Sequence, residues 1–257
     1  MKEAVFLPPA ERRVFLRLLL DFGEALLLCG AEIGRTEDTL TRIGTAYGAS
    51  RMNVYVSIYT IIVTMEYDDQ ECTMTRRIGR TASIDFRQLE ELNALSRRIC
   101  AAPLPAAELR ESLCSIRTER KSSAPLFAGS ILGAFSFAVF FGGNLLDGAA
   151  AAVCALFVCV LQERLSPYCP NSAVYYFLCS LFSGLLIGLL GRMPVLKLDK
   201  VMIGDIMLIN PGIAMMNAFR DMMVGNTLSG TLRFVESMLW AAALACGIMA
   251  ALKIMGA

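Results

Sequence analysis

The chain has 257 residues, of which 56% are hydrophobic, and its 24 Lys and Arg residues against 23 Asp and Glu residues leave a formal net charge of only +1. This composition is more apolar than that of an average soluble domain, and it lacks the basic excess that accompanies nucleic-acid binding. The absence of histidine excludes His-ligated metal sites, a Ser-His-Asp triad and a histidine proton relay.

Charged residues divide the sequence into two parts. Residues 1–122 contain 17 of the Lys and Arg residues and 17 of the Asp and Glu residues, whereas residues 123–257 contain 7 and 6. We therefore expect an α+β domain over residues 1–122 and an all-α transmembrane domain over residues 123–257. The nine cysteines are scattered without a CxxC pair, so we expect neither a disulfide framework nor a metal site. We expect no cofactor.

Helical periodicity and strand-like composition follow one another in the first part. Residues 11–29 and 33–48 space their apolar side chains at helical intervals, which predicts a pair of helices. Residues 51–67 are rich in Val, Ile, Thr and Tyr and predict two strands with a turn near their middle, and residues 71–78 predict another strand. Residues 85–99 predict an amphipathic helix that begins at a capping Asp or Ser.

Five apolar segments follow in the second part. Each approaches or exceeds the roughly 20 residues that cross a hydrocarbon core. They are residues 124–141, 145–162, 171–191, 200–224 and 231–255. Glycines recur four residues apart in two of them, at Gly129 and Gly133 and at Gly184 and Gly188, and this spacing favours close helix packing in lipid. We predict five spans, one of them broken.

The orientation of these spans is predicted from RTERK, residues 117–121, directly before the first span. Because positive residues beside a first span favour the cytoplasmic side, the N-terminal domain is expected in the cytosol and the C-terminus outside. The basic residues Arg192, Lys197 and Lys200 argue against this topology, since it places their loop outside.

The fourth apolar segment contains a break, in the stretch INPGIAMMNAFRDMMVGNTLSG over residues 209–230. Proline removes a backbone donor, which lipid tolerates only where protein or a water-filled cavity receives the freed groups. Asn210 followed by Pro211 suits an N-cap and a first helical position, so we predict that a half-helix starts there and continues through Gly212. Its unpaired N–H groups would attract a substrate carboxylate.

Polar residues continue along this half-helix. Asn210, Asn217 and Asp221 are 7 and 4 residues apart and share one helical face, which Gly225 continues. We therefore place Asn217 and Asp221 with the break in a substrate-binding set. The alternative is a proline-kinked helix whose asparagines bond neighbouring helices, with Arg220 and Asp221 marking the cytosolic interface.

Three further acids fall within the apolar segments, namely Asp147, Asp205 and Glu236. Ionisable groups at membrane depth are costly and often mark ion or substrate paths, so these three are candidates for proton coupling, with Asp205 the most deeply placed. The alternative is structural pairing, for example of Glu236 with Arg233, or an interfacial position for Asp147.

The quoted residues carry a family resemblance. The pattern formed by Pro211, Gly212, Asn217, Arg220, Asp221, Gly225, Ser229 and Gly230 resembles the signature of the threonine/serine exporter family. In the first part, GAEIGRTEDTLTRI over residues 30–43 is similar to that family's amphipathic segment, with Glu32, Arg35 and Glu37 at matching positions. TMTRRI over residues 73–78 matches more weakly. The resemblance extends from about residue 14 to about residue 250.

The resemblance implies a secondary exporter rather than an enzyme. A family member has a cytosolic domain and a five-span membrane half, works in a prokaryotic cytoplasmic membrane and uses the proton motive force. Single-chain members carry a second membrane half that this sequence lacks, so the chain is similar to split members that a separate small membrane protein completes. We infer that such a partner enters as an inverted repeat; a higher oligomer is left open.

The substrate is a small molecule, and two classes fit. The resemblance allows threonine and serine, and also succinate, which some split members export. Neutral amino acids need only one anion site plus polar acceptors such as Asn217, whereas a dicarboxylate needs a further cation, for which the apolar half offers few candidates beyond Arg220 and Arg233. We therefore favour threonine and serine.

Two other functions compete with export. One is a membrane-anchored hydrolase, whose charged residues would be Glu24, Glu32, Glu37, Asp38, Arg76 and Arg77, but the sequence has no GxSxG, Walker A or GxGxxG motif. The other is a regulatory or assembly subunit whose partner transports alone. Besides its substrate and its protein partner, we expect contact with membrane lipid and none with nucleic acid.

Overall fold

The chain forms two compact units in the computed structural model, which describes residues 7–79, 85–118, 123–166, 168–169 and 171–256. The α+β unit comprises Met1–Arg120 and Asn217–Thr231, and the helical unit comprises Lys121–Met216 and Leu232–Ala257. The expected domain boundary at residue 122 and residues 119–121 of the basic cluster lie outside the described residues.

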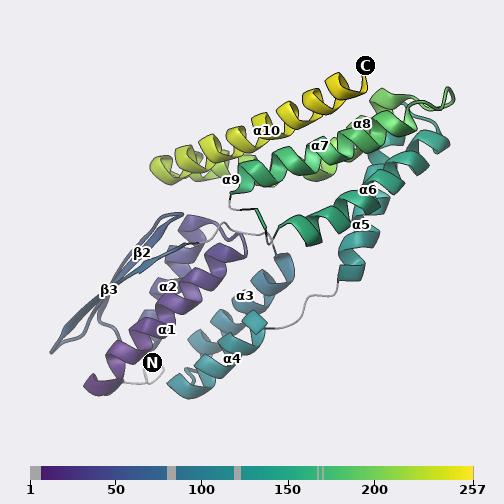
Figure 1. Ribbon diagram of the computed structural model, residues 1–257. Helices are drawn as coiled ribbons and strands as arrows, with labels where there is room; N and C mark the ends of the chain where they lie inside the picture. The colour runs from purple at the N-terminus through teal and green to yellow at the C-terminus, as the bar shows by residue number, and fades with distance from the viewer. Residues whose placement is uncertain (1–6, 80–84, 119–122, 167, 170, 257) are drawn as a thin grey trace. The chain divides into compact units, whose positions relative to one another are not determined.

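The α+β unit is built on a three-stranded antiparallel sheet with strand order β1-β2-β3. Its strands are β1 (Arg51–Val56), β2 (Thr60–Glu66) and β3 (Glu71–Arg77), and its helices are α1 (Pro9–Leu28), α2 (Ile33–Ala46), α3 (Phe86–Ala101) and α4 (Ala106–Thr118). Helix α1 packs on β2 and β3, and α2 packs on β1, so these two helices cover one face of the sheet (Figure 1).

Buried and more exposed side chains alternate along β2, and the buried ones pack the sheet against the helices. Ile61, Val63 and Met65 are fully buried in one core with the apolar side chains of α1 and α2, while the residues between them face away. The turn before β2 is closed by a hydrogen bond from Ser57 N to Thr60 O of 2.7 Å. The predicted pair of strands and the third strand are therefore confirmed.

The helices of this unit agree with the sequence in all but one case. Asp85 caps α3 through a 3.1 Å hydrogen bond from Gln88 N to its carboxylate, as the predicted capping residue should. Helix α4 was not expected. It buries only Leu109 and Leu113, four residues apart, and so short an apolar pattern gave no signal.

The helical unit is formed by apolar helices. They are α5 (Ser123–Phe140), α6 (Leu145–Leu165), α7 (Ser172–Leu190), α8 (Leu198–Ile209), and parts of α9 (Gly212–Met223) and α10 (Thr227–Met255). Of the described helices, α6, α7 and α10 are long and apolar enough to cross a membrane, and the pair α8 and α9, bent by 52°, makes a fourth if it forms one span. The apolar part of α5, Ala124–Phe140, is shorter.

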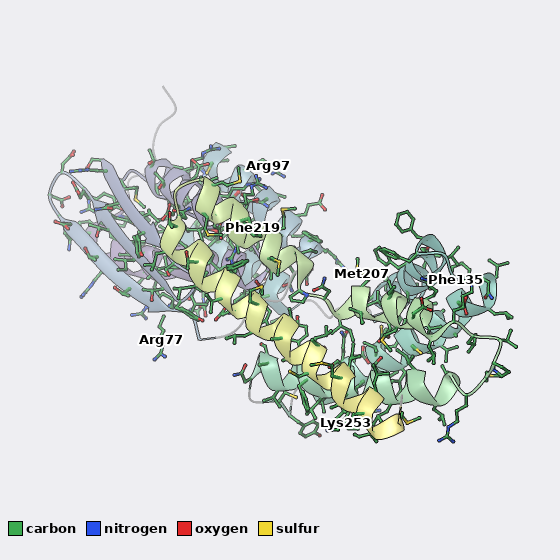
Figure 2. The ribbon with its side chains drawn as sticks, turned by 90° about the horizontal axis from the view of Figure 1, so that it is seen from above. Arg77, Arg97, Phe135, Met207, Phe219 and Lys253 are labelled. Atoms are coloured by element: carbon green, nitrogen blue, oxygen red, sulfur yellow. The ribbon has the colours of Figure 1, made fainter. Side chains whose placement is uncertain are left out.

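Small residues bring these helices together. A Cβ added at Gly204 of α8 would lie 2.7 Å from the carbonyl oxygen of Ala134 on α5, and one at Gly184 of α7 would lie 2.7 Å from Cβ of Ala251 on α10. The close packing predicted at Gly184 is thus confirmed, whereas a Cβ at Gly129 would meet nothing within 4 Å among the described residues. Figure 2 shows the side chains of this bundle, with Phe135 of α5 and Met207 of α8 labelled.

Candidate functional site

The predicted break lies between α8 and α9. Asn210 has the extended backbone that a following proline favours (ψ 129), and Pro211 has no N–H with which to continue α8. Gly212 N donates to Asn210 O at 2.8 Å, and Met215 N donates to Pro211 O at 3.1 Å. Helix α9 therefore starts at Gly212. Asn210 is the exposed C-cap of α8, so the expectation that it caps α9 is wrong by one residue.

Helix α9 carries the next two predicted residues. Asp221 is buried and Asn217 is half-buried, four residues apart on one face of the helix. Gly225 does not continue this face, because the helix ends at Met223 and Gly225 adopts a positive φ of 101°. In this C-terminal turn, Asn226 N donates to Asp221 O at 2.9 Å, which satisfies a carbonyl that the helix leaves unpaired.

Asp205 is the most buried acid of α8. Its side chain is 1% exposed, and its Oδ2 accepts a hydrogen bond from the hydroxyl of Ser183 on α7. Its Oδ1 is buried and has no hydrogen-bond partner among the residues that the structure describes. Cys154 on α6 and Cys179 on α7 are buried as well. An ionised carboxylate is costly in such surroundings unless a proton or a cation reaches it.

Asp147 is buried in a different arrangement. Its Oδ2 accepts from Asn144 N and its Oδ1 accepts from Lys197 N, each at 2.8 Å, while Asn144 Oδ1 accepts from Asp147 N. The carboxylate thus closes a capping box at the start of α6 and joins it to the loop before α8. Lys197, the N-cap of α8, precedes Asp205 by eight residues, so these two residues are separated by a rise of roughly 12 Å along α8.

Glu236 is half-buried on α10, directly before the buried Ser237. The hydroxyl of Ser237 donates to the carbonyl of Phe234 at 2.8 Å, so it is satisfied within its own helix. The three predicted acids therefore occupy different surroundings on α6, α8 and α10, and of these three only Asp205 has a buried carboxylate oxygen without a recorded partner.

The motif residues Glu32, Arg35 and Glu37 lie at the start of α2 or directly before it. Glu32, the residue before the helix, forms a 2.9 Å ion pair with Arg220, which belongs to the same α+β unit. Glu37 accepts a 2.9 Å hydrogen bond from Val56 N at the end of β1. Arg35 is exposed. Two of these three residues thus make specific contacts, and the Glu32 contact joins the two parts of the sequence resemblance.

The six charged residues of the hydrolase alternative do not assemble into one site. Arg76 binds Asp21 at 2.6 Å and Glu24 at 2.9 Å, whereas Asp38 forms an exposed pair with Arg42. Arg77 is exposed and extends away from the sheet (Figure 2). Across the described part of the chain, no group of three or more His, Cys, Asp and Glu side chains could hold a metal ion.

Ser183, which holds Asp205, is not among the residues that the sequence patterns predicted. It directly precedes Gly184, and the spacing of the glycines in that segment predicted only close helix packing. A serine within an apolar span is itself a signal, because its hydroxyl must find an acceptor in lipid.

Comparison with known proteins places the chain. The family model described as "Putative threonine/serine exporter" (ThrE) matches residues 17–255. The chain is similar to the "Probable succinate transporter subunit YjjP" of Klebsiella aerogenes, with 23% identity over 96% of both chains, and to that of Escherichia coli, with 25% identity over 96% of both. No solved structure matches the chain. With a family match that covers nearly its whole length, the chain belongs to the threonine/serine exporter family.

Proposed function

We propose that the chain is one membrane half of a two-component secondary exporter for small carboxylate-bearing metabolites, with Asp205 as the residue that carries the coupled proton. The observation behind this proposal is the buried Asp205 carboxylate, which has one oxygen held by Ser183 and the other without a recorded partner. The family match supports export as the general activity.

Proton coupling requires a group whose charge changes during the cycle. When Asp205 is ionised, Ser183 supplies one hydrogen bond, and Oδ1 still needs a proton or a cation because burial removes water from it. Protonation at Oδ1 removes the charge without disturbing the bond from Ser183. A neutral Asp205 then suits a closed, dry arrangement and an ionised Asp205 suits one that is open to water.

The break between α8 and α9 is the proposed substrate site. The first N–H groups of a helix lack acceptors within it, and together with the helix dipole they attract anions. In α9 Gly212 N bonds Asn210 O and Met215 N bonds Pro211 O, so the turn is held in place while the N–H groups between them, those of Ile213 and Ala214, can receive a carboxylate. Asn217 and Asp221 lie one and two turns further along and would contact the substrate's other polar groups.

We propose the cytoplasmic membrane as the location, with the α+β unit in the cytosol. The basic cluster before α5 supports this orientation. If α5 to α10 form five spans, the residues before α5 and the turn between α9 and α10 lie on the same side of the membrane. This agrees with the assignment of both segments to the α+β unit. A second small membrane protein would supply the other half, as the word subunit in the relatives' names suggests.

Succinate is the first substrate to test, because both relatives carry it in their names. Threonine and serine are the second candidates. The family description favours them, and so does the pairing of Arg220 with Glu32, which leaves one cation fewer for a second carboxylate. The sequence alone favoured threonine and serine over succinate, which is the opposite order.

The test measures efflux of labelled succinate, threonine and serine from cells that express the chain, its candidate partner or both. Only cells with both proteins should export, and Asn217→Ala should reduce export at normal membrane levels. If the partner alone exported substrate at the same rate as the two proteins together, this chain would have a regulatory or assembly role. Export that is unaffected by Asn217→Ala would remove the broken helix from the substrate path.

A further inference from the structure

The C-terminal part of α9, the turn after it and the start of α10 belong to the α+β unit, as the segment Asn217–Thr231. We call this segment the elbow. Two polar contacts join it to the first part of the chain. Arg220 Nη1 binds Glu32 Oε1 at 2.9 Å, and the Ser229 hydroxyl donates to Ser57 Oγ, in the turn between β1 and β2, at 3.5 Å. The second contact spans 172 residues, so the elbow is held by tertiary structure rather than by its neighbours in sequence.

Glu32 is the residue of this pair whose place in the fold is unusual. It occupies the N-cap position of α2, where Ser, Thr, Asp and Asn are the residues that cap a helix best. Its side chain makes no capping hydrogen bond, and its carboxylate binds Arg220 instead. Two residues further on, a Cβ added at Gly34 would lie 3.7 Å from Asn226 Nδ2, so the first turn of α2 touches the elbow a second time. The start of α2 therefore serves as a support for the elbow.

The break before α9 increases the importance of this support. Pro211 has no N–H with which to continue the hydrogen bonds of α8, and the two helices meet at a bend of 52°. Helix α8 alone therefore does not fix the rotation of α9 about its own axis. At the other end of α9, a Cβ added at Gly230 would lie 2.8 Å from Ala218 O, so α10 crosses α9 closely there. This crossing and the ion pair of Arg220 hold the C-terminal end of α9.

We propose that Glu32 is a positioning residue of the transport site, which acts through Arg220 by setting the rotation of α9. Asn217 lies three residues before Arg220 on this helix, so any rotation that moves Arg220 also moves the Asn217 amide. Helix α9 is continuous from Gly212, so the N–H groups of its first turn move as well. Since the site in question is the one proposed above, this role rests on the proposed function.

The ion pair affects position more than stability. The side chain of Arg220 is 60% exposed, and exposed ion pairs contribute little to the free energy of unfolding. A binding site, in contrast, loses affinity when its groups are displaced by a fraction of an ångström. We therefore expect that loss of the pair weakens substrate binding and leaves the melting temperature of the protein close to that of the wild type.

The first experiment measures KM and Vmax for labelled succinate, threonine and serine in proteoliposomes that contain the chain and its candidate partner. Glu32→Gln should raise KM for the transported substrate by about tenfold and leave Vmax per folded protein nearly unchanged. Arg220→Gln should have the same effect, and the double variant should be no worse than either single one, because both remove one contact. Exchange of the two charges, in Glu32→Arg with Arg220→Glu, should restore KM.

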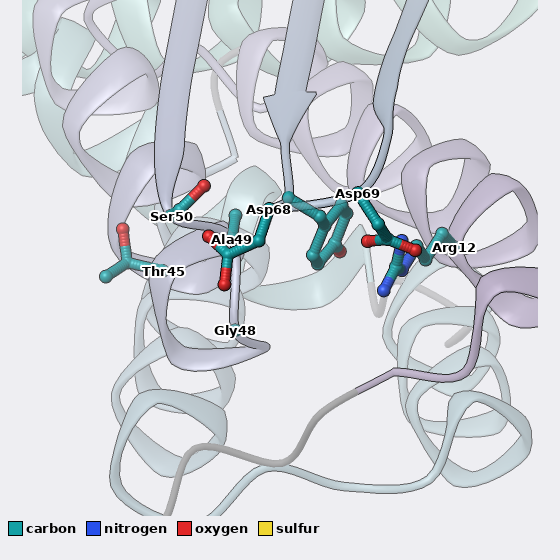
Figure 3. Close-up of a pocket in the computed structure, with 8 residues that line it drawn as sticks. Arg12, Thr45, Gly48, Ala49, Ser50, Asp68 and Asp69 are labelled. Carbon is teal, nitrogen blue, oxygen red and sulfur yellow. The ribbon is translucent and has the colours of Figure 1, made fainter.

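Matched controls locate the effect. Asp38→Asn breaks a 2.7 Å pair with Arg42 that is exposed and lies within α2 itself. Asp68→Asn alters an exposed acid near the opposite end of β1, where Figure 3 shows Ser50 and Asp68 beside a cavity. Both variants should keep the wild-type KM.

A second experiment does not require transport. Ala214→Cys places a thiol in the first turn of α9, and its reaction with a maleimide is followed by mass spectrometry of the peptide that contains it, in the full-length chain in detergent. Peptide-level detection separates this thiol from the native cysteines. Adding Glu32→Gln should raise the reaction rate severalfold, because α9 is held less firmly, whereas adding Asp38→Asn should leave it unchanged.

Where transport is seen, KM decides. An unchanged KM in Glu32→Gln, or a fall in Vmax alone, would overturn the positioning role. A raised KM in Arg220→Gln but not in Glu32→Gln would also overturn it, because Arg220 would then act on the substrate directly. If the wild type transports none of the three substrates, the proposed function fails, and the reaction rate at position 214 still decides whether Glu32 positions α9.

Discussion

Ser183 on α7 donates its hydroxyl hydrogen to Oδ2 of Asp205 on α8, and Oδ1 of the same carboxylate is buried without a partner among the described residues. This half-satisfied carboxylate differs from Asp147, whose two oxygens each accept a backbone N–H. A fully bonded carboxylate fixes structure, whereas a half-bonded one leaves an oxygen that a proton can reach. We therefore expect different results when the two acids are replaced.

Replacement of Ser183 tests the role of its hydrogen bond to Asp205. In Ser183→Ala the ionised form of Asp205 loses its recorded hydrogen bond, so transport should persist with its pH midpoint moved to a higher pH. The measurement is the rate of substrate transport over a pH series in membrane vesicles. Ser180→Ala is the matched control, since the Ser180 hydroxyl bonds the carbonyl of Phe177 in its own helix. Identical pH profiles for all three proteins would contradict the expectation.

Replacement of Asp147 tests the structural role of that acid. Asp147→Ala removes the acceptor of the Asn144 and Lys197 N–H groups, and the loss of each partly buried hydrogen bond costs about 0.5–1.5 kcal/mol. We expect a lower melting temperature in detergent and a fall in transport that matches the fall in membrane level. If Asp147→Ala instead kept its full level and lost proton coupling, Asp147 would belong to the proton path.

The contact between α7 and α10 gives a prediction of stability. A Cβ at Gly247 would overlap the hydroxyl of Ser180, so Gly247→Ala should destabilise the protein by about 1–3 kcal/mol through overpacking. Gly129→Ala serves as the control, because its added Cβ meets nothing within 4 Å of the described residues. Thermal unfolding of both variants in detergent checks the difference, and equal stabilities would argue against this helix contact.

The pair of Arg12 and Asp69 predicts a dependence on pH. The hydrogen bond from Arg12 holds the pKa of Asp69 below its ordinary value of 3.8. A carboxyl group with a lowered pKa in the folded state stabilises the fold above the unfolded value and loses this effect as the pH falls through the folded value. Asp69→Asn should therefore be less stable than the wild type at neutral pH, with a difference that narrows below a pH of about 3.8.

The same series of thermal unfolding curves includes a control. Glu90→Gln removes an exposed acid from α3 and should follow the wild type at every pH. A difference for Asp69→Asn that widened toward acid pH would contradict the assigned sign.

Local patterns in the sequence predicted most of the elements. The β-branched run over residues 51–67 predicted the first two strands, and proline with glycine at 211 and 212 predicted the helix break, because these signals depend on neighbouring residues alone. Helix α4 was missed because its buried residues, Leu109 and Leu113, make too short a pattern. The N-cap of α9 was placed one residue too early, at Asn210, since an Asn-Pro pair can end one helix as well as begin another.

Contacts between distant segments could not be predicted in this way. The sequence marked Asp205 as an apolar-segment acid, but its hydrogen bond to Ser183 spans 22 residues and depends on how α7 packs on α8. The bond between Asp147 and Lys197 spans 50 residues for the same reason. Periodicity identifies which face of a helix is polar, whereas the partner of that face follows only from the packing.

The most direct test of the central claim compares gradient-driven transport with exchange in proteoliposomes that contain the chain and its proposed partner. Asp205→Asn should lose transport driven by an imposed pH gradient and keep exchange of labelled for unlabelled substrate, because exchange does not require the proton to leave. Asp199→Asn, which alters an exposed acid of the same helix, should retain both activities. Gradient-driven transport by Asp205→Asn at the wild-type rate would contradict the assignment of proton coupling to Asp205.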